Sequence, residues 1–203
     1  FRGSNITEYS VPEGVTTFES STFRTCTNLE KILIPATVES ITGNPFYPLK
    51  QLSLIEVSSD NSKYSSDEGA IYNKDKTQLI YCFSKGSKYT VKDNVKTLKT
   101  FSFANKSNLE EIILPEGLEK IESQCFSRCI NLKGLQIGSN VNSLSGMSFF
   151  GVSLTKITID ENNPYYVIEN NMLLNKNKTI LLDTLSSLEE IIIPNGVKEI
   201  ANY

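Results

Sequence analysis

Apolar residues recur along the chain at a spacing of 23 positions. The pattern is fullest in residues 108–126, and residues 85–103 and 131–149 repeat it on either side. A fixed period of about 20 to 30 residues is typical of stacked supersecondary units, because one unit cannot bury its apolar face alone. The sequence therefore predicts a repeat solenoid.

Each unit contains a short alternating segment, seen at Leu109, Ile112 and Leu114. Alternation is the period of a β-strand with one buried face, and Pro115 ends the strand because it has no N–H to donate. We expect the equivalent strands to form a parallel ladder on one face of a right-handed, mostly β coil with almost no α-helix. One aromatic residue per coil should stack in the core as a spine: Phe23, Phe46, Phe103, Phe126 and Phe149.

A turn follows the strand of each unit. Glycine or asparagine lies two residues past the proline position at Gly14, Asn94, Gly117, Asn140 and Gly196. Because these two residue types tolerate backbone conformations that others avoid, we expect an unusual backbone at this position.

Two longer units resemble each other. Residues 58–91 align without a gap with residues 160–193. In each unit two apolar runs flank a polar tip, at residues 73–77 and 175–179. This pattern predicts two inserted β-hairpins, which we expect to be peripheral to the coil.

The polar segments before these hairpins, residues 58–69 and 160–171, are predicted to be loops. Their carboxylates are candidate calcium ligands: Asp60, Asp67, Asp160 and Glu161. Neither segment has the alternating acidic order and closing Glu of a calcium-binding loop. Asn and Asp also cap turns with their own side chains, so turn capping is the favoured interpretation.

The repeat covers the chain of 203 residues. A solenoid grows linearly and needs no single central core, so residues 1–203 are predicted to form one continuous domain. Phe1 occupies the spine position of a unit, and Tyr203 precedes the spine position of its own unit. We therefore interpret the sequence as an excerpt of a longer chain, open at both ends.

Charge and hydropathy disfavour several classes of partner. A net charge of −3 and a pI near 5.2 give no basic field to attract nucleic acid or anionic lipid. No apolar run approaches the roughly 20 residues of a membrane span, and the N-terminus lacks the basic-then-apolar layout of a signal peptide. We expect no nucleic-acid partner and no membrane span in this segment.

Residues for catalysis are scarce in this sequence. It has no histidine, which removes histidine-activated nucleophiles and imidazole metal ligands. No phosphate-binding glycine motif occurs. The carboxylate pairs Glu110 with Glu111 and Glu189 with Glu190 recur at strand positions, where a solvated charge is expected. The sequence predicts a protein that is not an enzyme and holds no cofactor.

The cysteines follow the repeat. Cys26 and Cys129 both lie three residues past a spine phenylalanine, where a small apolar thiol fits a tight corner. They are several coils apart, at about 4.8 Å per coil, which is too far for a disulfide. Cys125 and Cys129 are four residues apart, but no second pair could complete a zinc site. We predict four reduced core thiols and no metal.

The unit resembles that of the BspA-like leucine-rich-repeat proteins. Residues 34–41, IPATVESI, and residues 125–132, CFSRCINL, carry the family pattern closely. Cys125 replaces the usual small alanine. Three residues fill the usual cysteine position: Leu49, Lys106 and Val152.

This resemblance implies a class of function. Members are surface proteins of oral bacteria and protozoan parasites, used in adhesion to host cells or to matrix proteins such as fibronectin, and they share no catalytic residue. It implies a cell-surface or secreted location and a protein ligand. The alternative is an intracellular scaffold that uses the same surface, and a signal sequence or anchor in the full-length chain would separate the two.

The predicted binding surface is the outward face of the strand ladder. Apolar residues at solvent-facing positions indicate an interaction site when they form a contiguous patch, as Leu33 and Leu54 on neighbouring strands would. The alternative is that they satisfy β-propensity or are covered by other parts of the protein. The candidate binding residues are Lys31, Leu33, Leu54, Glu56, Lys88, Glu111, Ile113 and Ile192.

Overall fold

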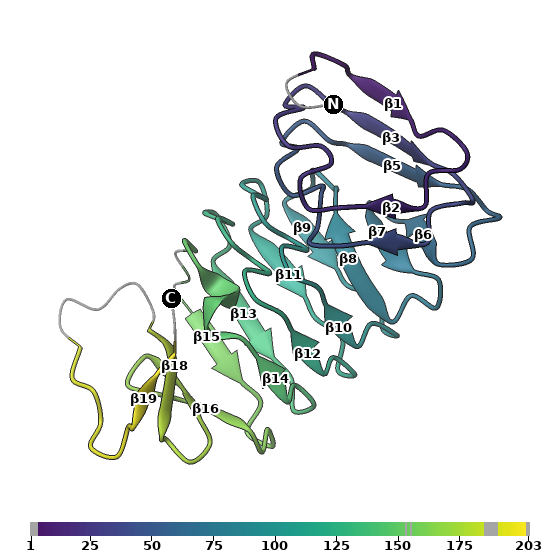
Figure 1. The fold of residues 1–203 in the computed structure, drawn as a ribbon. Coiled ribbons are helices and arrows are strands. Elements are labelled where there is room, and N and C mark those ends of the chain that lie inside the picture. The colour runs from purple at the N-terminus through teal and green to yellow at the C-terminus, as the bar shows by residue number, and fades with distance from the viewer. Residues whose placement is uncertain (1–3, 153, 155, 185–190, 202–203) are drawn as a thin grey trace.

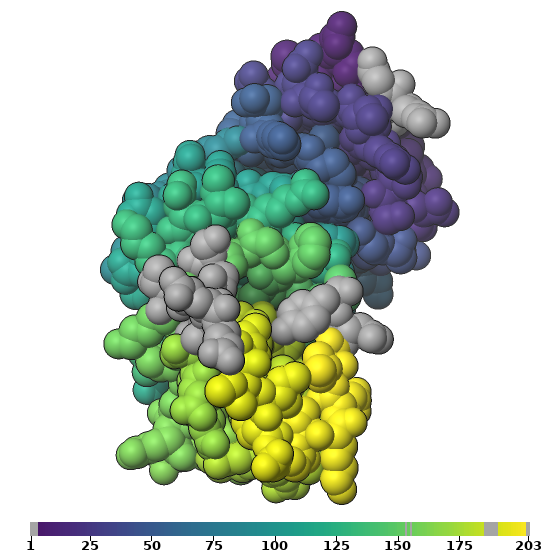
Figure 2. Space-filling view, turned by 90° about the vertical axis from the view of Figure 1, so that its left-hand side faces the viewer, coloured from purple at the N-terminus to yellow at the C-terminus, as the bar shows by residue number. Residues whose placement is uncertain are grey.

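The computed structural model describes residues 4–152, 154, 156–184 and 191–201. Short strands stack in chain order from the purple N-terminal end to the yellow C-terminal end (Figure 1), and the same order is visible on the surface (Figure 2). Among the described residues the helical segment is a single 3₁₀ turn, η1 (Gly146–Phe149). The predicted mostly β solenoid is confirmed, and it makes about eight turns.

A parallel ladder of strands, here called the front ladder, runs along one side of the coil. Strands pair at the repeat spacing, so that Ile32 lies opposite Tyr9 on one neighbour and Ile55 on the other. Ile32 and Ile55 are buried because alternation turns them to the core. The strands of the front ladder are β1 (Glu8–Ser10), β3 (Lys31–Ile34), β5 (Leu54–Val57), β9 (Lys88–Thr90), β11 (Glu111–Ile113), β13 (Gly134–Ile137) and β15 (Lys156–Ile159).

A second set of parallel strands, here called the back ladder, closes the other side. Four of its two-residue strands place one side chain in the core, as at Phe18, Leu98, Ile121 and Leu144, which are buried. Both residues of β4 are half-buried, and both residues of β19 are exposed. The short strands of the back ladder are β2 (Thr17–Phe18), β4 (Ser40–Ile41), β10 (Thr97–Leu98), β12 (Lys120–Ile121), β14 (Ser143–Leu144) and β19 (Glu199–Ile200).

Each long unit folds into a three-stranded antiparallel meander. The predicted hairpins are its second and third strands, and both meanders carry a bulge at the same point, Ile71/Tyr72 in one and Leu173/Leu174 in the other. The third strand pairs parallel with the back ladder. The meander strands are β6 (Tyr64–Asp67), β7 (Ala70–Asn73) and β8 (Gln78–Cys82), and β16 (Tyr166–Glu169), β17 (Met172–Asn175) and β18 (Ile180–Thr184).

The first meander strands, β6 and β16, correct the expectation that the polar segments are loops throughout. Asn61 is fully buried, and its Nδ2 donates to the carbonyls of Pro35 and Val38 in the preceding coil at 2.8 and 3.0 Å. Its Oδ1 accepts from the backbone N–H groups two and three residues further on. Asn163 makes the same four bonds before β16. The amide thus ties the polar segment to the coil below and allows it to continue as a strand.

A tyrosine hydroxyl accepts the hydrogen bond that the next back-ladder strand would accept, at each place where a meander interrupts the back ladder. Tyr64 Oη accepts from the N–H of Ile41 at 2.9 Å, and Tyr166 Oη accepts from the N–H of Leu144 at 2.9 Å. Without the tyrosine, these two backbone N–H groups would have no partner strand to accept their hydrogen bonds. A buried donor without a partner is costly, so the hydroxyls stabilise the interruption.

The front ladder is interrupted as well, which differs from the continuous ladder expected from the repeat. Strand β5 pairs with β3 and not with β9, and β11 and β13 belong to separate sheets. The first interruption has a direct cause, because the chain between β5 and β9 forms the meander. Because the meander takes the place of an ordinary coil, β5 and β9 do not pair.

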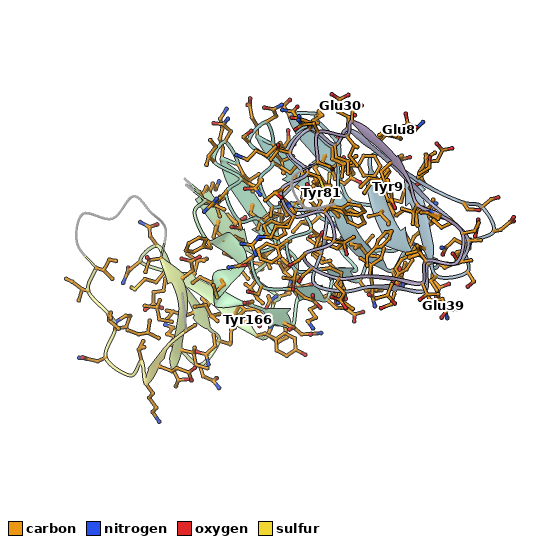
Figure 3. The ribbon with its side chains drawn as sticks, turned by 45° about the horizontal axis from the view of Figure 1, so that its top comes forward. Glu8, Tyr9, Glu30, Glu39, Tyr81 and Tyr166 are labelled. Atoms are coloured by element: carbon orange, nitrogen blue, oxygen red, sulfur yellow. The ribbon has the colours of Figure 1, made fainter. Side chains whose placement is uncertain are left out.

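The first meander is central, and the expectation of a peripheral insertion is wrong. The side chains of its hairpin alternate between two buried clusters. Ile71 and Tyr81 pack with the N-terminal cluster, whereas Tyr72 and Leu79 pack with the central cluster. Figure 3 shows Tyr81 inside the stack of coils, while Glu8 and Glu30 lie at its outer edge. The hairpin is thus a wall with core on both faces.

The predicted phenylalanine spine forms as two stacks. Phe23 and Phe46 stack with their ring centroids 6.1 Å apart, and Phe103, Phe126 and Phe149 stack at 5.6 and 5.9 Å. Tyr81 of the meander follows Phe46 at 5.9 Å and ends the first stack. Burial of each such ring contributes about 1.5–3 kcal/mol to the free energy of unfolding.

Only some of the repeats have a positive φ at the turn position two residues past the proline. Gly14 and Gly196 have φ of 93° and 110°, but the other three candidates do not have positive φ. Asn94 instead donates from Nδ2 to the carbonyl of Asp75 in the tip of the first hairpin at 3.0 Å, and Asn140 donates to the carbonyl of Glu116 in the preceding coil at 2.9 Å. Asparagine is therefore useful there because its side chain links neighbouring units.

Candidate binding surface

The outward side chains of the front ladder lie in two rows at the repeat spacing. Lys31 lies between Glu8 and Leu54, and Leu33 lies between Ser10 and Glu56. In the second front-ladder sheet the corresponding pairs are Lys88 with Glu111 and Thr90 with Ile113. The structure therefore brings the candidate residues together in two groups, Lys31, Leu33, Leu54 and Glu56 in one and Lys88, Glu111 and Ile113 in the other.

The charged members of the first row neutralise one another. Lys31 pairs with Glu8 at 3.1 Å, and Lys88 pairs with Glu111 at 2.9 Å. These side chains are largely exposed, so the pairs contribute little to stability. They leave no strong field of one sign over this surface, which favours a partner recognised by shape and apolar contact.

The apolar members are the unusual ones. Leu54 is 40% exposed and Ile113 is 42% exposed, while Leu33 is half-buried. Leu33 and Leu54 occupy diagonal positions on the adjacent strands β3 and β5. Two neighbouring apolar side chains on a flat sheet form the start of a contact patch.

The structure places Ile192 off the ladder. Residues 191–193 are not in a strand, and Ile191, Ile192 and Ile193 are 47%, 76% and 43% exposed. Ile192 is exposed as predicted, but so are both of its neighbours, so this segment has no buried face. Alternation selects the buried side only where a strand is paired, and this segment pairs with no described strand. Glu189 and Glu190 lie outside the described residues.

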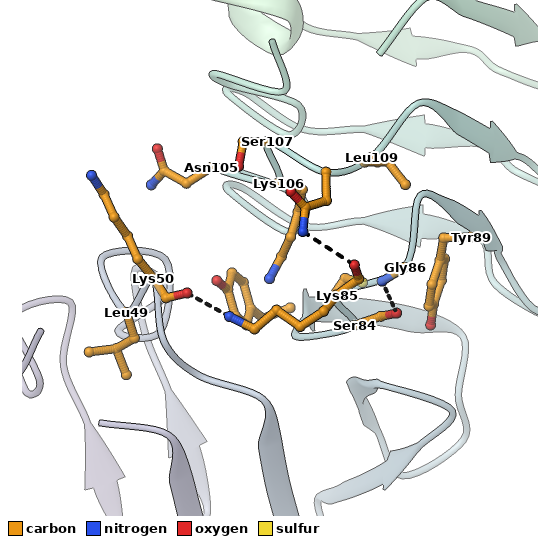
Figure 4. Close-up of a pocket in the computed structure, with 13 residues that line it drawn as sticks. Leu49, Lys50, Ser84, Lys85, Gly86, Tyr89, Asn105, Lys106, Ser107 and Leu109 are labelled. Atoms are coloured by element: carbon orange, nitrogen blue, oxygen red, sulfur yellow. Dashed lines mark hydrogen bonds between the residues drawn. The ribbon is translucent and has the colours of Figure 1, made fainter. Parts of the chain in front are cut away.

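Sequence reasoning missed a cavity of about 100 Å³ beside the interruption between β5 and β9 (Figure 4). Lys106 lies in its lining with its Nζ 4.7 Å from the centroid of the Tyr81 ring. Burial lowers the pKa of Lys106 to about 8. The signal was present in the sequence, since Lys106 fills a position that holds Cys26 and Cys129 in other coils, but only the structure shows the space around it.

The cysteine side chains are packed in the core. No disulfide joins them, and all four are buried. Cys129 Sγ donates to the carbonyl of Phe103 at 3.0 Å, and Cys125 Sγ lies 3.1 Å from Ser102 Oγ. Burial raises the pKa of Cys82 to about 11 and that of Cys129 to about 12. These groups remain thiols near neutral pH, which makes them poor nucleophiles and poor metal ligands.

The acidic candidates for calcium have other partners. Asp67 binds Lys76 and Lys92 at 2.7 and 3.2 Å, and the hydrogen bond from Lys76 is the main reason that its pKa is lowered. Asp160 Oδ1 accepts from the N–H of Asn162 at 2.9 Å, which is the expected turn capping. Within the described ranges, no three His, Cys, Asp or Glu side chains lie close enough to hold a metal ion. Within the same ranges no helix is long and apolar enough to cross a membrane.

The repeat pattern identifies the family. The family described as "BspA type Leucine rich repeat region" matches residues 1–78 and 80–203 in six copies. The chain belongs to this family. Its members are generally non-enzymatic modules that interact with proteins. The family resemblance seen in the sequence is thereby confirmed. No curated protein matches the chain.

Two solved structures share the fold of this BspA-type chain. A leucine-rich repeat protein from Eubacterium ventriosum has a TM-score of 0.72 and 26% identity, over 78% of this chain and 43% of that protein. The pneumococcal vaccine antigen PcpA has a TM-score of 0.63 and 23% identity, over 93% of this chain and 55% of that protein. The chain therefore spans about half the length of each, and the second likeness concerns the fold alone.

Proposed function

We propose that this chain is an adhesion or host-recognition module that binds a protein through its front ladder. The observation that supports this is the pair Leu33 and Leu54, diagonal neighbours on β3 and β5. Their partners on adjacent strands in the same two rows are polar, Ser10 and Glu56 beside Leu33 and Lys31 beside Leu54. Leucine at an outward position lowers solubility without adding core packing, so its presence on two adjacent strands favours a contact role.

A cell-surface or secreted location belongs to the same proposal. It is supported by the resemblance to BspA-like surface proteins and by a protein of the same fold that is named as a pneumococcal vaccine antigen. The ligand would be a host protein or a matrix protein, met by the rigid ladder without rearrangement. Charge pairs such as Glu8 with Lys31 would form the polar rim of the contact.

The binding experiment compares the double substitution Leu33→Ser with Leu54→Ser against the unmodified chain. We expect binding of the labelled protein to cultured host cells and to fibronectin-coated surfaces to weaken at least about tenfold, equivalent to about 1.4 kcal/mol. The double variant should remain folded, with a small loss of melting temperature, because Leu54 is 40% exposed and Leu33 is outside the buried core. Unchanged binding by a folded double variant would contradict the proposal.

A matched control is available on another surface. Ile130 is 58% exposed and lies in the corner before β13, away from the outward rows. Ile130→Ser removes a comparable exposed apolar side chain, so it should leave binding unchanged. Equal losses from both variants would show a nonspecific apolar effect.

The alternative is an intracellular scaffold that binds a protein through the same ladder. The four buried, unpaired cysteines are compatible with either location and do not discriminate between the two. Labelling intact cells that express the full-length protein with a membrane-impermeant reagent separates the two. Labelling without lysis supports the adhesin, and labelling only after lysis supports the scaffold.

A further inference from the structure

The cavity beside the front-ladder interruption is lined by three corners of the coil. Lys50 comes from the corner before β5, Lys85 from the corner before β9, and Lys106 from the corner before β11. Lys85 Nζ donates to the carbonyl of Lys50 at 2.6 Å and so bridges the interruption. The cavity therefore exists only because the meander separates two front-ladder strands.

Lys106 is out of place in the repeat. The equivalent residues Cys26, Leu49 and Cys129 are buried and uncharged. Lys106 extends along the same path, and its ammonium ends over the Tyr81 ring at 4.7 Å. Among the described residues no carboxylate and no hydrogen-bond acceptor pairs with Lys106 Nζ. A partly buried ammonium held by one aromatic ring retains donors for a further partner.

The whole lining is electropositive. It contains Lys50, Lys85 and Lys106 and no Asp or Glu, although the chain carries a net charge of −3. Burial also lowers the pKa of Lys85, and the nearest acidic influence on it is Glu30. Two partly desolvated ammonium groups share one small space, which favours an anion between them.

The remaining lining suits the carbon skeleton of an organic anion. Leu49, Tyr89 and Leu109 provide apolar walls. The Ser84 hydroxyl accepts from the N–H of Gly86 at 3.3 Å, which leaves its own hydrogen available to a ligand oxygen. A volume of about 100 Å³ accommodates a carboxylate and a few methylene groups.

We propose that this cavity is a binding site for a carboxylate on a short aliphatic chain, held between Lys106 and Lys85. The carboxylate belongs either to a small free acid or to a glutamate side chain of a bound polypeptide. In both cases it neutralises the uncompensated ammonium of Lys106 and links the corners on the two sides of the interruption. The site is separate from the outward rows of the front ladder and does not depend on them.

Proton binding by Lys106 gives the site a characteristic pH dependence. With the pKa of Lys106 near 8, the charged form predominates at pH 7 and the neutral amine at pH 9. Cys82 and Cys129 face Lys106 and stay neutral in this window because their pKa values are raised to about 11 and about 12. The pKa of Tyr81 is also raised by burial, and Lys85 adds the like charge. Affinity for a carboxylate should fall about tenfold between pH 7 and pH 9.

The test is titration of the protein with glutarate by isothermal calorimetry at pH 7, with 1,5-pentanediol as the neutral control. We expect saturable binding of glutarate and none of the diol. Lys106→Leu should reduce the affinity at least tenfold, and it installs the residue that Leu49 shows to fit the equivalent position. Lys156→Leu removes an exposed lysine outside the cavity and should leave the affinity unchanged.

A second lysine variant and a competing peptide complete the test. Lys85→Met should also weaken glutarate binding, which covers the case in which Lys106→Leu fails to fold. A peptide containing glutamate that competes with glutarate assigns the carboxylate to a polypeptide, and failure to compete assigns it to a small acid. No saturation at millimolar glutarate, tighter binding of inorganic phosphate, or full affinity in both lysine variants would overturn the proposal.

Discussion

The two meanders have the same internal structure and different surroundings. Residues 64–82 and 166–184 share their strand register, their bulge and the bonds of Asn61 and Asn163. In the first meander Tyr81 is buried against the N-terminal cluster, whereas Asp183 occupies the same place in the second and is only half-buried. Both hairpins separate two buried clusters, but among the described residues the cluster beyond the second hairpin is small and consists of Met172, Leu174 and Leu181. The comparison shows that local sequence builds the meander, and that its neighbours decide how large a core lies on each side.

The largest expected effect comes from exchanging these two residues. Tyr81→Asp removes a buried ring that packs on Phe46 and puts a carboxylate in the core with Lys106 as its one nearby cation, so it should lower the free energy of unfolding by about 3–5 kcal/mol. Asp183→Tyr adds an aromatic ring at a half-buried position and should change it by less than about 1 kcal/mol. Urea denaturation followed by circular dichroism measures both. Similar losses in the two variants would show that positions 81 and 183 have equivalent surroundings.

Substitution of the two buried asparagines should instead destabilise the protein by equal amounts, in contrast to the unequal effects at Tyr81 and Asp183. Asn61→Ala and Asn163→Ala each remove four hydrogen bonds and leave carbonyl and N–H groups unpaired, so each should cost about 2–4 kcal/mol. Denaturation midpoints of the two variants give the comparison. A loss confined to Asn61→Ala would mean that the anchor matters only in the central meander.

The smallest effect is expected at the hairpin tips. Asn73 Nδ2 donates to Thr77 Oγ1 at 2.9 Å, and Asn175 makes the same bond to Thr179. Asn73→Ala and Asn175→Ala should each cost about 0.5–1.5 kcal/mol, because the tips are solvated and water replaces part of the lost bonding. Thermal melts resolve this range, and a loss several times larger at Asn73 would show that the first tip is coupled to the core it divides.

Much of the fold could be predicted from the sequence because the same pattern of apolar residues recurs in successive units. The spacing of Phe103, Phe126 and Phe149 predicted their stacking, and the match of residues 58–91 with 160–193 predicted two equivalent hairpins. The first strand of each meander was missed because its residues are polar, and the anchoring role of Asn61 depends on carbonyls about 23–26 positions away. One domain over residues 1–203 remains a prediction.

The candidate site was predictable in part. Alternation correctly predicted that Leu54 and Ile113 are exposed, and Leu33 is half-buried on the same face, because each lies in a paired strand. Alternation did not predict that residues 191–193 are all exposed. This segment pairs with no described strand, so it has no buried face. Lys106 was visible as a departure from the repeat, but a departure in sequence carries no information about the space beside it.

The period, the front-ladder strands of the ordinary coils and their core side chains follow from local patterns of apolar residues and proline, so the sequence is sufficient to predict them. Only the tertiary structure shows where the ladders are interrupted, that the first hairpin has a core on both faces, and where a cavity opens. Those features depend on how a unit of unusual length stacks on its neighbours. That stacking is a property of contacts between coils, which no pattern within one coil contains.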